Sequence, residues 1–476
     1  MPSHQSPPYL LPLNASLATL PPALDEAISD VERQFDLPTE KLQQITEKML
    51  WEYNKGLSEL HTDETRDTFM PMIPSYIQQI PNGSEKGTFL ALDLGGTNLR
   101  VCEVTLLGDK KWTMKQQKYK VSDALKMGDV TTLFDYIAGS VDHFLTEIGT
   151  DAAEDEKLHL GFTFSFPVLQ TALAAGTLIN WTKGFECKNA VGKDVVQLLQ
   201  EALDRKHIHV RCSALVNDTC GTLMAAAYER GDALCGGIFG TGTNGAYVEE
   251  VAKITKMGIK EDELEKDRQA GLDKMVVNTE WGAFDNERKV MPFTVFDSRV
   301  DRISINPRKQ AYEKVLFKGY SSTALNRHYG LDTAVMSALE AYTVPNSKES
   351  GDPISTIRDV ITSHLGIAPS LVEDADALAA ARVSEIVGTR GCRLSACAIA
   401  ATVRQTGNDK PDGKRVIFGL DGSLVEFYPR FEERVRTALK ELLGEEVEKR
   451  VAIVMAKDGS GVGAMAMEQK GATVTN

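Results

Sequence analysis

The segment Thr88-Phe-Leu-Ala-Leu-Asp-Leu-Gly-Gly-Thr-Asn98 combines an apolar run of strand length with an abrupt glycine turn. The pattern returns at Gly236-Gly-Ile-Phe-Gly-Thr-Gly-Thr-Asn244, where the apolar residues after the turn predict a hairpin. Glycines let backbone N–H groups converge on an anion, and phosphate is the natural one. A single glycine turn is usually only a turn, but two copies with adjacent hydroxyls favour a pair of phosphate-binding loops.

Neither turn belongs to the two commonest nucleotide-binding motifs. They do not match Gly-x-x-x-x-Gly-Lys-Ser/Thr, and they do not form a Gly-x-Gly-x-x-Gly sequence that opens a helix. The P-loop and Rossmann assignments therefore fail. Asp93 stands directly before the first glycine pair, where a carboxylate could hold a magnesium-bound water beside phosphates.

Strands and helices alternate between and after these two copies. A strand is predicted over Leu160–Val168 and another over Val210–Leu215, which delivers Asn217-Asp218 to a small-residue helix over Thr219–Tyr228. The same reasoning predicts helices over 39–60, 377–404 and around 431–442, strands over 415–420 and 451–455, and a solvated charged helix face over 260–268. Strands that alternate with helices predict an α/β fold.

Length and composition restrict the function classes. A chain of 476 residues predicts two or three domains at roughly 100–200 residues each. The net charge of −14 disfavours partners such as nucleic acid or an anionic membrane surface, and no apolar run approaches the ~18–20 residues of a membrane span. Seven dispersed cysteines argue against a disulfide framework and favour a reducing, cytoplasmic location.

Seven motifs occur in the order typical of the eukaryotic hexokinases, with a fungal character, and the resemblance covers residues 25–465. The motifs are Leu92-Asp-Leu-Gly-Gly-Thr-Asn-Leu-Arg100, Phe164-Ser-Phe-Pro167, Asn180-Trp-Thr-Lys-Gly-Phe185, Val216-Asn-Asp-Thr219, Phe239-Gly-Thr-Gly-Thr-Asn244, Asn278-Thr-Glu-Trp-Gly-Ala-Phe284 and Leu420-Asp-Gly-Ser423. The resemblance implies a two-lobed actin-like ATPase (ribonuclease H-like) fold with a sugar and nucleotide cleft between the lobes. It implies N-terminal helices of the large lobe (23–82), a small lobe (83–215), a large lobe (216–455) and a C-terminal segment that returns to the small lobe (456–476). Residues 1–22 precede this match, and their own composition, which lacks the features of a signal peptide, predicts a disordered leader.

The resemblance also assigns roles to residues. Asp218 matches the general base that takes the proton of the sugar 6-hydroxyl, although on local sequence it could instead cap the following helix. Lys183 matches a second catalytic residue, and together with Thr182 it matches the pair that contacts sugar and transferring phosphate in the family. The substrate-binding positions are Ser165, Phe166, Thr182, Lys183, Asn217, Asp218, Asn244, Glu280, Gln310 and Glu313. The cofactor-binding positions, for ATP and its bound Mg²⁺, are Asp93, Leu94, Gly95, Gly96, Thr97, Asn98, Gly240, Thr241, Gly242, Thr243, Gly422 and Ser423, with no separate metal site. Trp281 and Phe284 are expected to be wall and core residues.

One departure from the family is large. The family continues after the position of Glu313 with a Met-x-Ser-Gly-Met-Tyr-Leu-Gly-Glu helix, whereas here Glu313-Lys-Val-Leu316 runs straight into Phe317-Lys-Gly-Tyr320. An element of roughly six helical turns is therefore expected to be missing, through a deletion or a skipped exon, which would weaken ATP affinity and local stability.

The resulting prediction is an ATP-dependent hexokinase. Its reaction is phosphorylation of the 6-hydroxyl of glucose, and of fructose or mannose, as the first step of glycolysis in a cytoplasmic monomer or homodimer. A non-catalytic hexokinase-like sugar sensor is an alternative, favoured by the missing helix and opposed by the retained Asp218, Lys183 and Asn217. An actin-type or chaperone-type ATPase is a third possibility, but it would have no use for the motif 180–183 or for Glu280.

Overall fold

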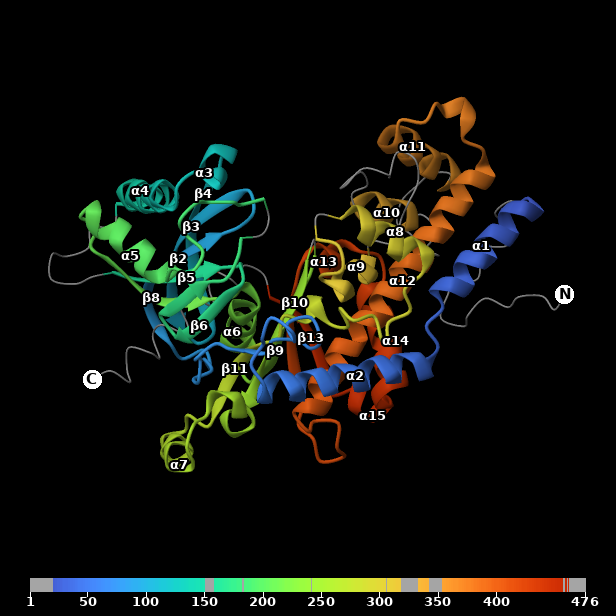
Figure 1. Cartoon of the computed structure of the whole chain (residues 1–476). Helices are drawn as coiled ribbons and strands as arrows, with labels where there is room; N and C mark the ends of the chain where they lie inside the picture. Colours follow the sequence, from blue (N-terminus) through green and yellow to red (C-terminus); the bar gives the residue numbers. More distant parts are fainter. Residues whose placement is uncertain are drawn as a thin grey trace.

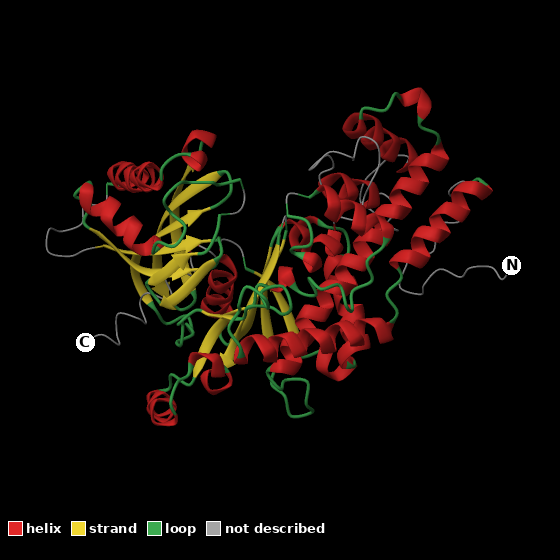
Figure 2. Cartoon of the chain, viewed as in Figure 1, coloured by secondary structure: helices red, strands yellow, loops and turns green. Residues whose placement is uncertain are grey.

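Two β-sheets organise the molecule (Figures 1 and 2). The computed structural model describes residues 20–149, 158–181, 184–240, 242–304, 306–317, 333–341, 353–456, 459 and 461. One sheet has five strands in the order β4-β3-β2-β5-β8, and the other has six in the order β1-β11-β10-β9-β12-β13. The strands of the five-stranded sheet are β2 (Lys86–Leu94), β3 (Asn98–Gly108), β4 (Lys111–Lys120), β5 (Leu158–Phe164) and β8 (Val210–Val216). Those of the six-stranded sheet are β1 (Ile73–Pro74), β9 (Ala233–Phe239), β10 (Thr243–Glu250), β11 (Lys274–Asn278), β12 (Val416–Asp421) and β13 (Val451–Met455).

The two sheets repeat one topology. In each, three consecutive strands form an antiparallel meander, β2–β3–β4 in one and β9–β10–β11 in the other. Two later strands then add in parallel beside the first, β5 and β8 in one and β12 and β13 in the other. Each glycine turn joins the first two strands of its meander. The repeated glycine motif in the sequence therefore marks a repeated sheet.

Parallel strands require crossover connections, and helices provide them. Helix α5 (Val195–Arg205) connects β5 to β8, and α14 (Phe431–Leu443) lies between β12 and β13. On the five-stranded sheet, α4 (Val130–Ile148) and α5 lie on the same side, as Figure 1 shows, and their apolar residues share one core with the strands. On the six-stranded sheet, α2 (Thr39–Ser58), α12 (Asp374–Gln405) and α14 contribute to a second, larger core.

Helix α6 (Asp218–Arg230) packs against both sheets. Its residues Ala225 and Tyr228 join a cluster with β2 and β3, whereas Leu223 and Met224 join one with β10 and β11. The approach is close, because a Cβ atom added at Gly236 would lie 2.3 Å from the backbone nitrogen of Leu223. The small residues predicted for this helix are thus those that fit between two sheets.

Most predicted elements are confirmed with small changes of bounds. The helix predicted over 39–60 ends at Ser58, so Leu60 is 65% exposed instead of continuing the apolar face. The single strand predicted over Leu160–Val168 is wrong: β5 ends at Phe164 and a separate strand, β6 (Val168–Ala172), pairs with β7 (Ala175–Leu178). Proline at position 167 lies in the turn between them, consistent with its lack of a backbone donor.

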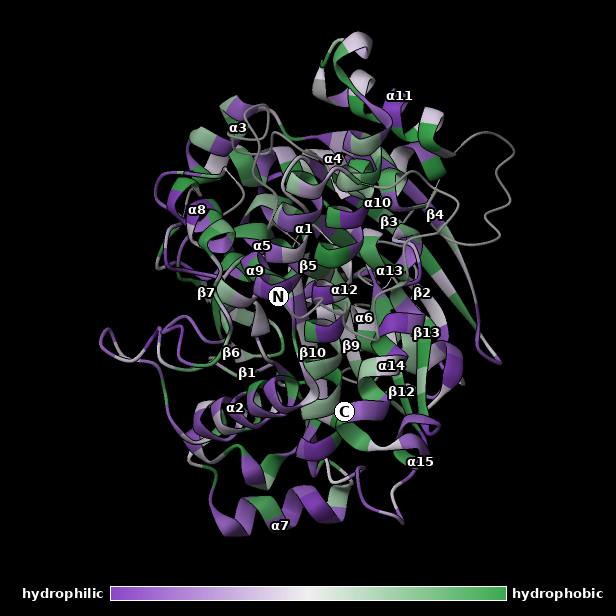
Figure 3. Cartoon of the chain, turned by 90° about the vertical axis from the view of Figure 1, so that its right-hand side faces the viewer, coloured by the Kyte–Doolittle hydropathy of each residue, from purple (hydrophilic) through white to green (hydrophobic). Residues whose placement is uncertain are grey.

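The helices predicted over 377–404 and around 431–442 and the strands predicted over 415–420 and 451–455 are confirmed as α12, α14, β12 and β13. The charged stretch forms α7 (Glu261–Ala270), whose residues are all at least partly exposed. Figure 3 shows it as a mainly hydrophilic helix at the edge of the molecule.

All seven cysteines lie in the described part and are buried free thiols. Within that part of the chain, no helix has both the length and the apolar character needed to cross a membrane.

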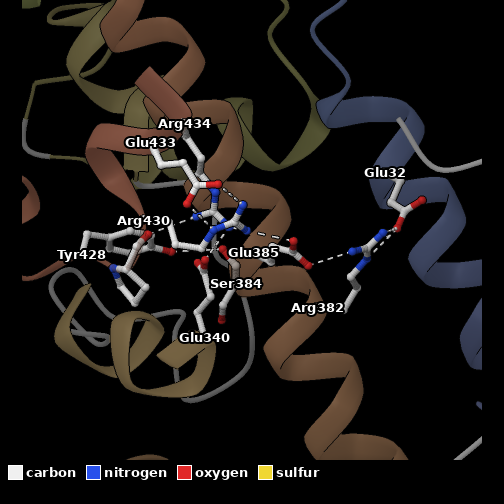
Figure 4. Close-up of polar contacts among 10 residues, drawn as sticks. Glu32, Glu340, Arg382, Ser384, Glu385, Tyr428, Arg430, Glu433 and Arg434 are labelled. Atoms are coloured by element: carbon white, nitrogen blue, oxygen red, sulfur yellow. Dashed lines mark hydrogen bonds and ion pairs between the residues drawn. The ribbon is translucent and has the colours of Figure 1, made fainter. Parts of the chain in front are cut away.

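A buried ionic network joins four helices of the larger core (Figure 4). Arg382 on α12 pairs with Glu32 on α1 (Pro22–Phe35) and with Glu385, each at 2.7 Å, and Arg434 on α14 pairs with Glu340 on α10 (Thr333–Ala341). All five side chains are almost fully buried. Removing one member of such a pair leaves a charge without its counter-ion in a dry core, so the network makes these helices depend on one another.

Glu52 on α2 provides a pH-dependent contribution to stability. The side chain is buried, and desolvation raises its pKa from 4.5 to about 8 despite Lys48 at 3.5 Å. Between the two pKa values, the native state keeps a proton on Glu52 that the unfolded state loses. The free energy of unfolding therefore falls as the pH rises through this range, by about 1.4 kcal/mol per pH unit. The glutamine of Glu52→Gln does not titrate. The free energy of unfolding of this variant, relative to that of the wild type, should therefore rise by about 2–4 kcal/mol when the pH is raised from about 5 to about 8. Denaturant unfolding at the two pH values measures this, and a pH-independent difference would contradict it.

Candidate functional site

The site begins where β8 ends and α6 starts. Asn217 is the N-cap of α6, and its Oδ1 accepts hydrogen bonds from the backbone nitrogen of Thr219 at 3.0 Å and from the Thr219 hydroxyl at 2.6 Å. Asp218 is the first helical residue and also accepts from the Thr219 nitrogen, at 2.9 Å. The cap position therefore belongs to Asn217 and not to Asp218. Both side chains are half-buried, which leaves the Asp218 carboxylate partly accessible to a substrate.

Two amide side chains and one carboxylate form a compact network with Asn217. The Nδ2 atom of Asn244 donates to Oδ1 of Asn278 at 2.9 Å, to Oε1 of Glu280 at 3.2 Å and, more weakly, to Oδ1 of Asn217 at 3.4 Å. Nδ2 of Asn278 donates to the same Glu280 oxygen at 2.9 Å. The structure thus brings together Asn217, Asn244 and Glu280, which the sequence assigned to one sugar site.

Glu280 has an unusual backbone. Its φ of 55° and ψ of 43° are left-handed, a conformation that a non-glycine residue adopts only where its surroundings impose it. The next residue, Trp281, is fully buried, and its Nε1 donates to the Thr243 hydroxyl at 2.9 Å. A Cβ atom added at Gly245 would lie 2.1 Å from the Trp281 ring, so only glycine allows this packing. Trp281 and Phe284 are confirmed as wall and core residues.

Gln310 and Glu313 lie beside the second glycine turn. Glu313 is on α9 (Ala311–Phe317), and its Oε2 accepts from the backbone nitrogen of Thr243 at 3.3 Å. Gln310, directly before this helix, covers Gly282, since a Cβ atom there would lie 2.5 Å from the Gln310 Oε1. Glu313 thus contacts the strand that carries Asn244 through Thr243. Gln310 lies against Gly282, which also adjoins the Thr243 carbonyl.

Ser165 and Phe166 occupy the turn between β5 and β6. Phe166 is buried and Ser165 is half-buried. A pocket opens here, and its lining includes Phe166 together with Asn217, Asn278 and Glu280. The turn after β5 therefore lines the same pocket as the polar network. The residues of that network come from the ends of other strands and from the start of α6.

An aromatic cluster holds the segment that leads to the predicted catalytic lysine. The rings of Phe166 and Trp181 meet edge to face at 5.0 Å, and Trp181 stacks on Phe185 at 5.4 Å. Trp181 also donates through Nε1 to the backbone carbonyl of residue 187 at 2.9 Å. Thr182 and Lys183 lie outside the described residues, so their roles remain predictions.

The first glycine turn is a tight hairpin. The Gly95 nitrogen donates to the carbonyl of Asn98 at 3.0 Å, and Gly96, Thr97 and Asn98 are at least partly exposed. Asp93 pairs with Arg100 across the hairpin at 3.0 Å, so one of its oxygens is engaged by a guanidinium. The side chain of Leu94 is buried in the core, which leaves only its backbone for contact with a nucleotide.

The second glycine turn lies against a third one, Asp421-Gly-Ser423, at the end of β12. A Cβ atom added at Gly240 would lie 3.7 Å from the Gly422 Cα and 3.7 Å from the Ser423 nitrogen, because β9 and β12 are parallel neighbours that end together. Gly422 has a φ of 113°, and a Cβ atom there would lie 2.3 Å from the Phe239 carbonyl oxygen. Gly242 adjoins Glu313, and Thr241 lies outside the described residues.

The described contacts form one continuous path from the third glycine turn to Asp218. They pass from Gly422 to the second turn, then from Thr243 to Asn244 and Asn217. Asn278 is a site residue that the sequence reasoning missed. Its position at the end of an apolar strand, opening the motif Asn278-Thr-Glu, was the available signal.

Models of protein families match the chain on both sides of this site. A family model described as hexokinase matches residues 27–228. A second model, also described as hexokinase, matches residues 234–316 and 314–468. The two pieces of the second match meet at residues 314–316 within α9, directly after Glu313, which supports the expected missing helix.

Individual relatives cover nearly the whole chain. A glucokinase of Aspergillus niger is 40% identical over 494 aligned positions, which cover 93% of this chain and 96% of the relative. The alignment is longer than the 476 residues of this chain, so the relative has residues with no counterpart here. Hexokinase-1 of Schizosaccharomyces pombe is 36% identical and covers 95% and 93% of the two chains.

A solved structure shares the fold. The hexokinase of Schistosoma mansoni, complexed with glucose, aligns with a TM-score of 0.77 and 33% identity, over 94% of this chain and 99% of the other. The α/β class and the actin-like ATPase architecture predicted from the sequence are therefore confirmed.

Proposed function

The chain belongs to the hexokinase family, and from this premise we propose that it transfers the γ-phosphoryl group of MgATP to the 6-hydroxyl of glucose, and of fructose or mannose. The observation that carries the proposal is the network of Asn217, Asn244 and Glu280 beside Asp218. Amides can donate to and accept from sugar hydroxyls, whereas carboxylates accept from them. A ring of such groups selects a polyhydroxylated substrate.

Asp218 is the proposed general base. Its half-buried carboxylate stands at the start of α6, one residue from the amide of Asn217. It would take the proton from the 6-hydroxyl as that oxygen attacks phosphorus, while Asn244 and Glu280 hold other hydroxyls in place. Lys183 would stabilise the charge that develops on the transferred group.

The three glycine turns have the donor types that suit a nucleotide. Backbone amides and the hydroxyls of Thr97, Thr243 and Ser423 would hold the phosphates, and MgATP, when bound, supplies the phosphoryl group. The close approach of Gly240 to Gly422 and Ser423 supports this assignment, because it brings the backbones of the second and third turns together. Asp93, oriented by Arg100, would contact a magnesium-bound water.

We further propose that substrate binding closes a small lobe (83–215) onto a large lobe (23–82 and 216–455), with the segment 456–476 returning to the small lobe. Water is a competing nucleophile, and closure over the sugar would exclude it. Gly461 lies close to β3, since a Cβ atom added there would be 4.0 Å from the Cys102 sulfur. This proximity supports the return of the C-terminal segment to the small lobe. Seven free thiols support a reducing, cytoplasmic setting for the protein. The proposed assembly is a monomer or a homodimer.

The non-catalytic alternative gains no support from these residues, because Asp218 is in place beside the sugar-binding network. A coupled assay of ADP release with glucose, fructose and mannose tests the proposed reaction directly. ADP release that does not depend on sugar would overturn it in favour of a plain ATPase, and glucose binding without turnover would favour a sensor.

Glu280→Ala should impair sugar use much more than nucleotide use. The substitution removes the carboxylate on which Asn244 and Asn278 converge, and unpaired polar groups cost about 1–3 kcal/mol each in a closed site. We expect the KM for glucose to rise at least tenfold while the KM for ATP changes little. Steady-state kinetics with each substrate varied in turn measure both. An unchanged KM for glucose with a raised KM for ATP would contradict the assignment.

A further inference from the structure

Asn278 lies at the centre of the polar network but is outside the set of residues matched to sugar contacts. Its side chain makes one hydrogen bond in each direction, since Oδ1 accepts from Asn244 and Nδ2 donates to Glu280, both at 2.9 Å. The residue is only 5% exposed. An amide with a donor on one side and an acceptor on the other is the one neutral side chain of this size that can link these two partners.

The backbone of Asn278 is held on both sides. It is the last residue of β11, and it pairs with Ala246 of β10 and with Ile73 of β1. The next residue, Thr279, donates through its nitrogen and its hydroxyl to the carbonyl of Gly245, at 2.9 and 2.8 Å. The Asn278 amide therefore projects from a backbone that strand pairing has already placed.

Both partners of Asn278 need an anchor. Glu280 has a left-handed backbone, which persists only where the surroundings over-determine it. Oε1 of Glu280 receives N–H donors from two amides, and those of Asn278 and Asn244 are 2.9 and 3.2 Å away. Asn244 is fixed at its other end, where its Oδ1 accepts from the Gly245 nitrogen at 2.7 Å.

We propose that Asn278 is a positioning residue that sets the affinity for the sugar by locking the Asn244 amide and the Glu280 carboxylate in one arrangement. The inference rests on the proposed function, because it takes these two side chains as sugar contacts. Asn278 acts through its partners. A preset arrangement spares the sugar the cost of ordering them, so the loss of Asn278 is felt in sugar binding more than in the chemical step.

The test compares Asn278→Ala and Asn278→Asp with the wild-type chain. The aspartate keeps the shape and the acceptor toward Asn244, but it removes the donor toward Glu280 and places a second carboxylate there. We expect both variants to bind glucose at least tenfold more weakly in calorimetry, with the KM for glucose raised likewise. The kcat and the KM for ATP should stay within about threefold, and the aspartate should be the more impaired variant.

Two further measurements separate positioning from general damage. Asn408→Ala removes a partly buried amide near the end of α12, where Asn408 Nδ2 donates to the Thr406 hydroxyl at 3.0 Å, and it should leave glucose affinity unchanged. A double-mutant cycle of Asn278→Ala with Glu280→Gln should be clearly non-additive, because the two residues act as a unit. Additive effects on glucose affinity would overturn the inference.

The outcomes distinguish this inference from the proposed function. If the wild-type chain neither binds glucose nor phosphorylates it, the proposed function fails. If the wild type does both and Asn278→Asp, with an unchanged melting temperature, binds glucose within twofold of it, the proposed function stands and the positioning role is wrong. A loss confined to the KM for ATP would also overturn the positioning role.

Discussion

Asp218→Asn should lower kcat by about 10²–10⁴-fold while glucose still binds within roughly tenfold of the wild-type affinity. The carboxamide keeps an oxygen that can accept from the Thr219 nitrogen, so the start of α6 should survive. It cannot take the proton of the 6-hydroxyl. The loss should therefore appear in the chemical step, and the coupled assay and glucose calorimetry together measure it.

Asp218→Ala is the companion variant. It also removes the hydrogen bond to Thr219, so it should match Asp218→Asn in turnover and fall slightly below it in melting temperature. The proposed base role would be refuted by either variant if it retained more than about a tenth of the wild-type kcat, which is less than a positioned base supplies. Glucose binding that vanished in both would instead indicate a role in substrate binding.

Arg390→Met should destabilise the protein by about 3–5 kcal/mol. The guanidinium is fully buried on α12 and makes a two-pronged pair with Asp297 on α8 (Val295–Ile303), at 2.7 and 2.8 Å. It also donates to the Val315 carbonyl on α9 at 2.9 Å. Methionine fills similar space but leaves the Asp297 carboxylate buried without its counter-ion. Denaturant unfolding and melting temperature measure the loss.

Two controls test the physical reason. Arg205→Met removes an exposed pair with Asp135, which lies at 2.6 Å, and should cost less than about 1 kcal/mol. Adding Asp297→Asn to Arg390→Met should recover part of the loss, since the uncompensated charge is then gone. A loss below about 1 kcal/mol for Arg390→Met alone would show that the core accommodates the free carboxylate.

Local sequence was enough to predict the elements that depend on neighbouring residues. The helix around residues 39–58 follows from its 3.6-residue apolar period, and both glycine hairpins follow from apolar runs that end in glycines. The error at 160–168 has the same local origin, because a continuous apolar run cannot show where one strand stops and a turn begins.

The assignment of site residues came from the order of seven motifs, and its contacts depend on strand pairing. Asn217, Asn244 and Glu280 come from three different strand ends, and the ladder between β10 and β11 brings two of them together. No spacing in the sequence predicts the 2.9 Å bond between Asn244 and Asn278. The left-handed backbone of Glu280 is equally invisible, because a non-glycine residue adopts it only where its tertiary surroundings impose it.

The residues alone established the repeated glycine hairpins, the alternation of strands and helices, and the type of chemistry at the strand ends, because these signals lie within a few residues of chain. The tertiary structure alone revealed the link made by Asn278, the pairing of Asp93 with Arg100 and the burial of Glu52. Each of these depends on which segments become neighbours and how much water they exclude. That information is a property of the packed sheets and helices and is absent from any short stretch of sequence.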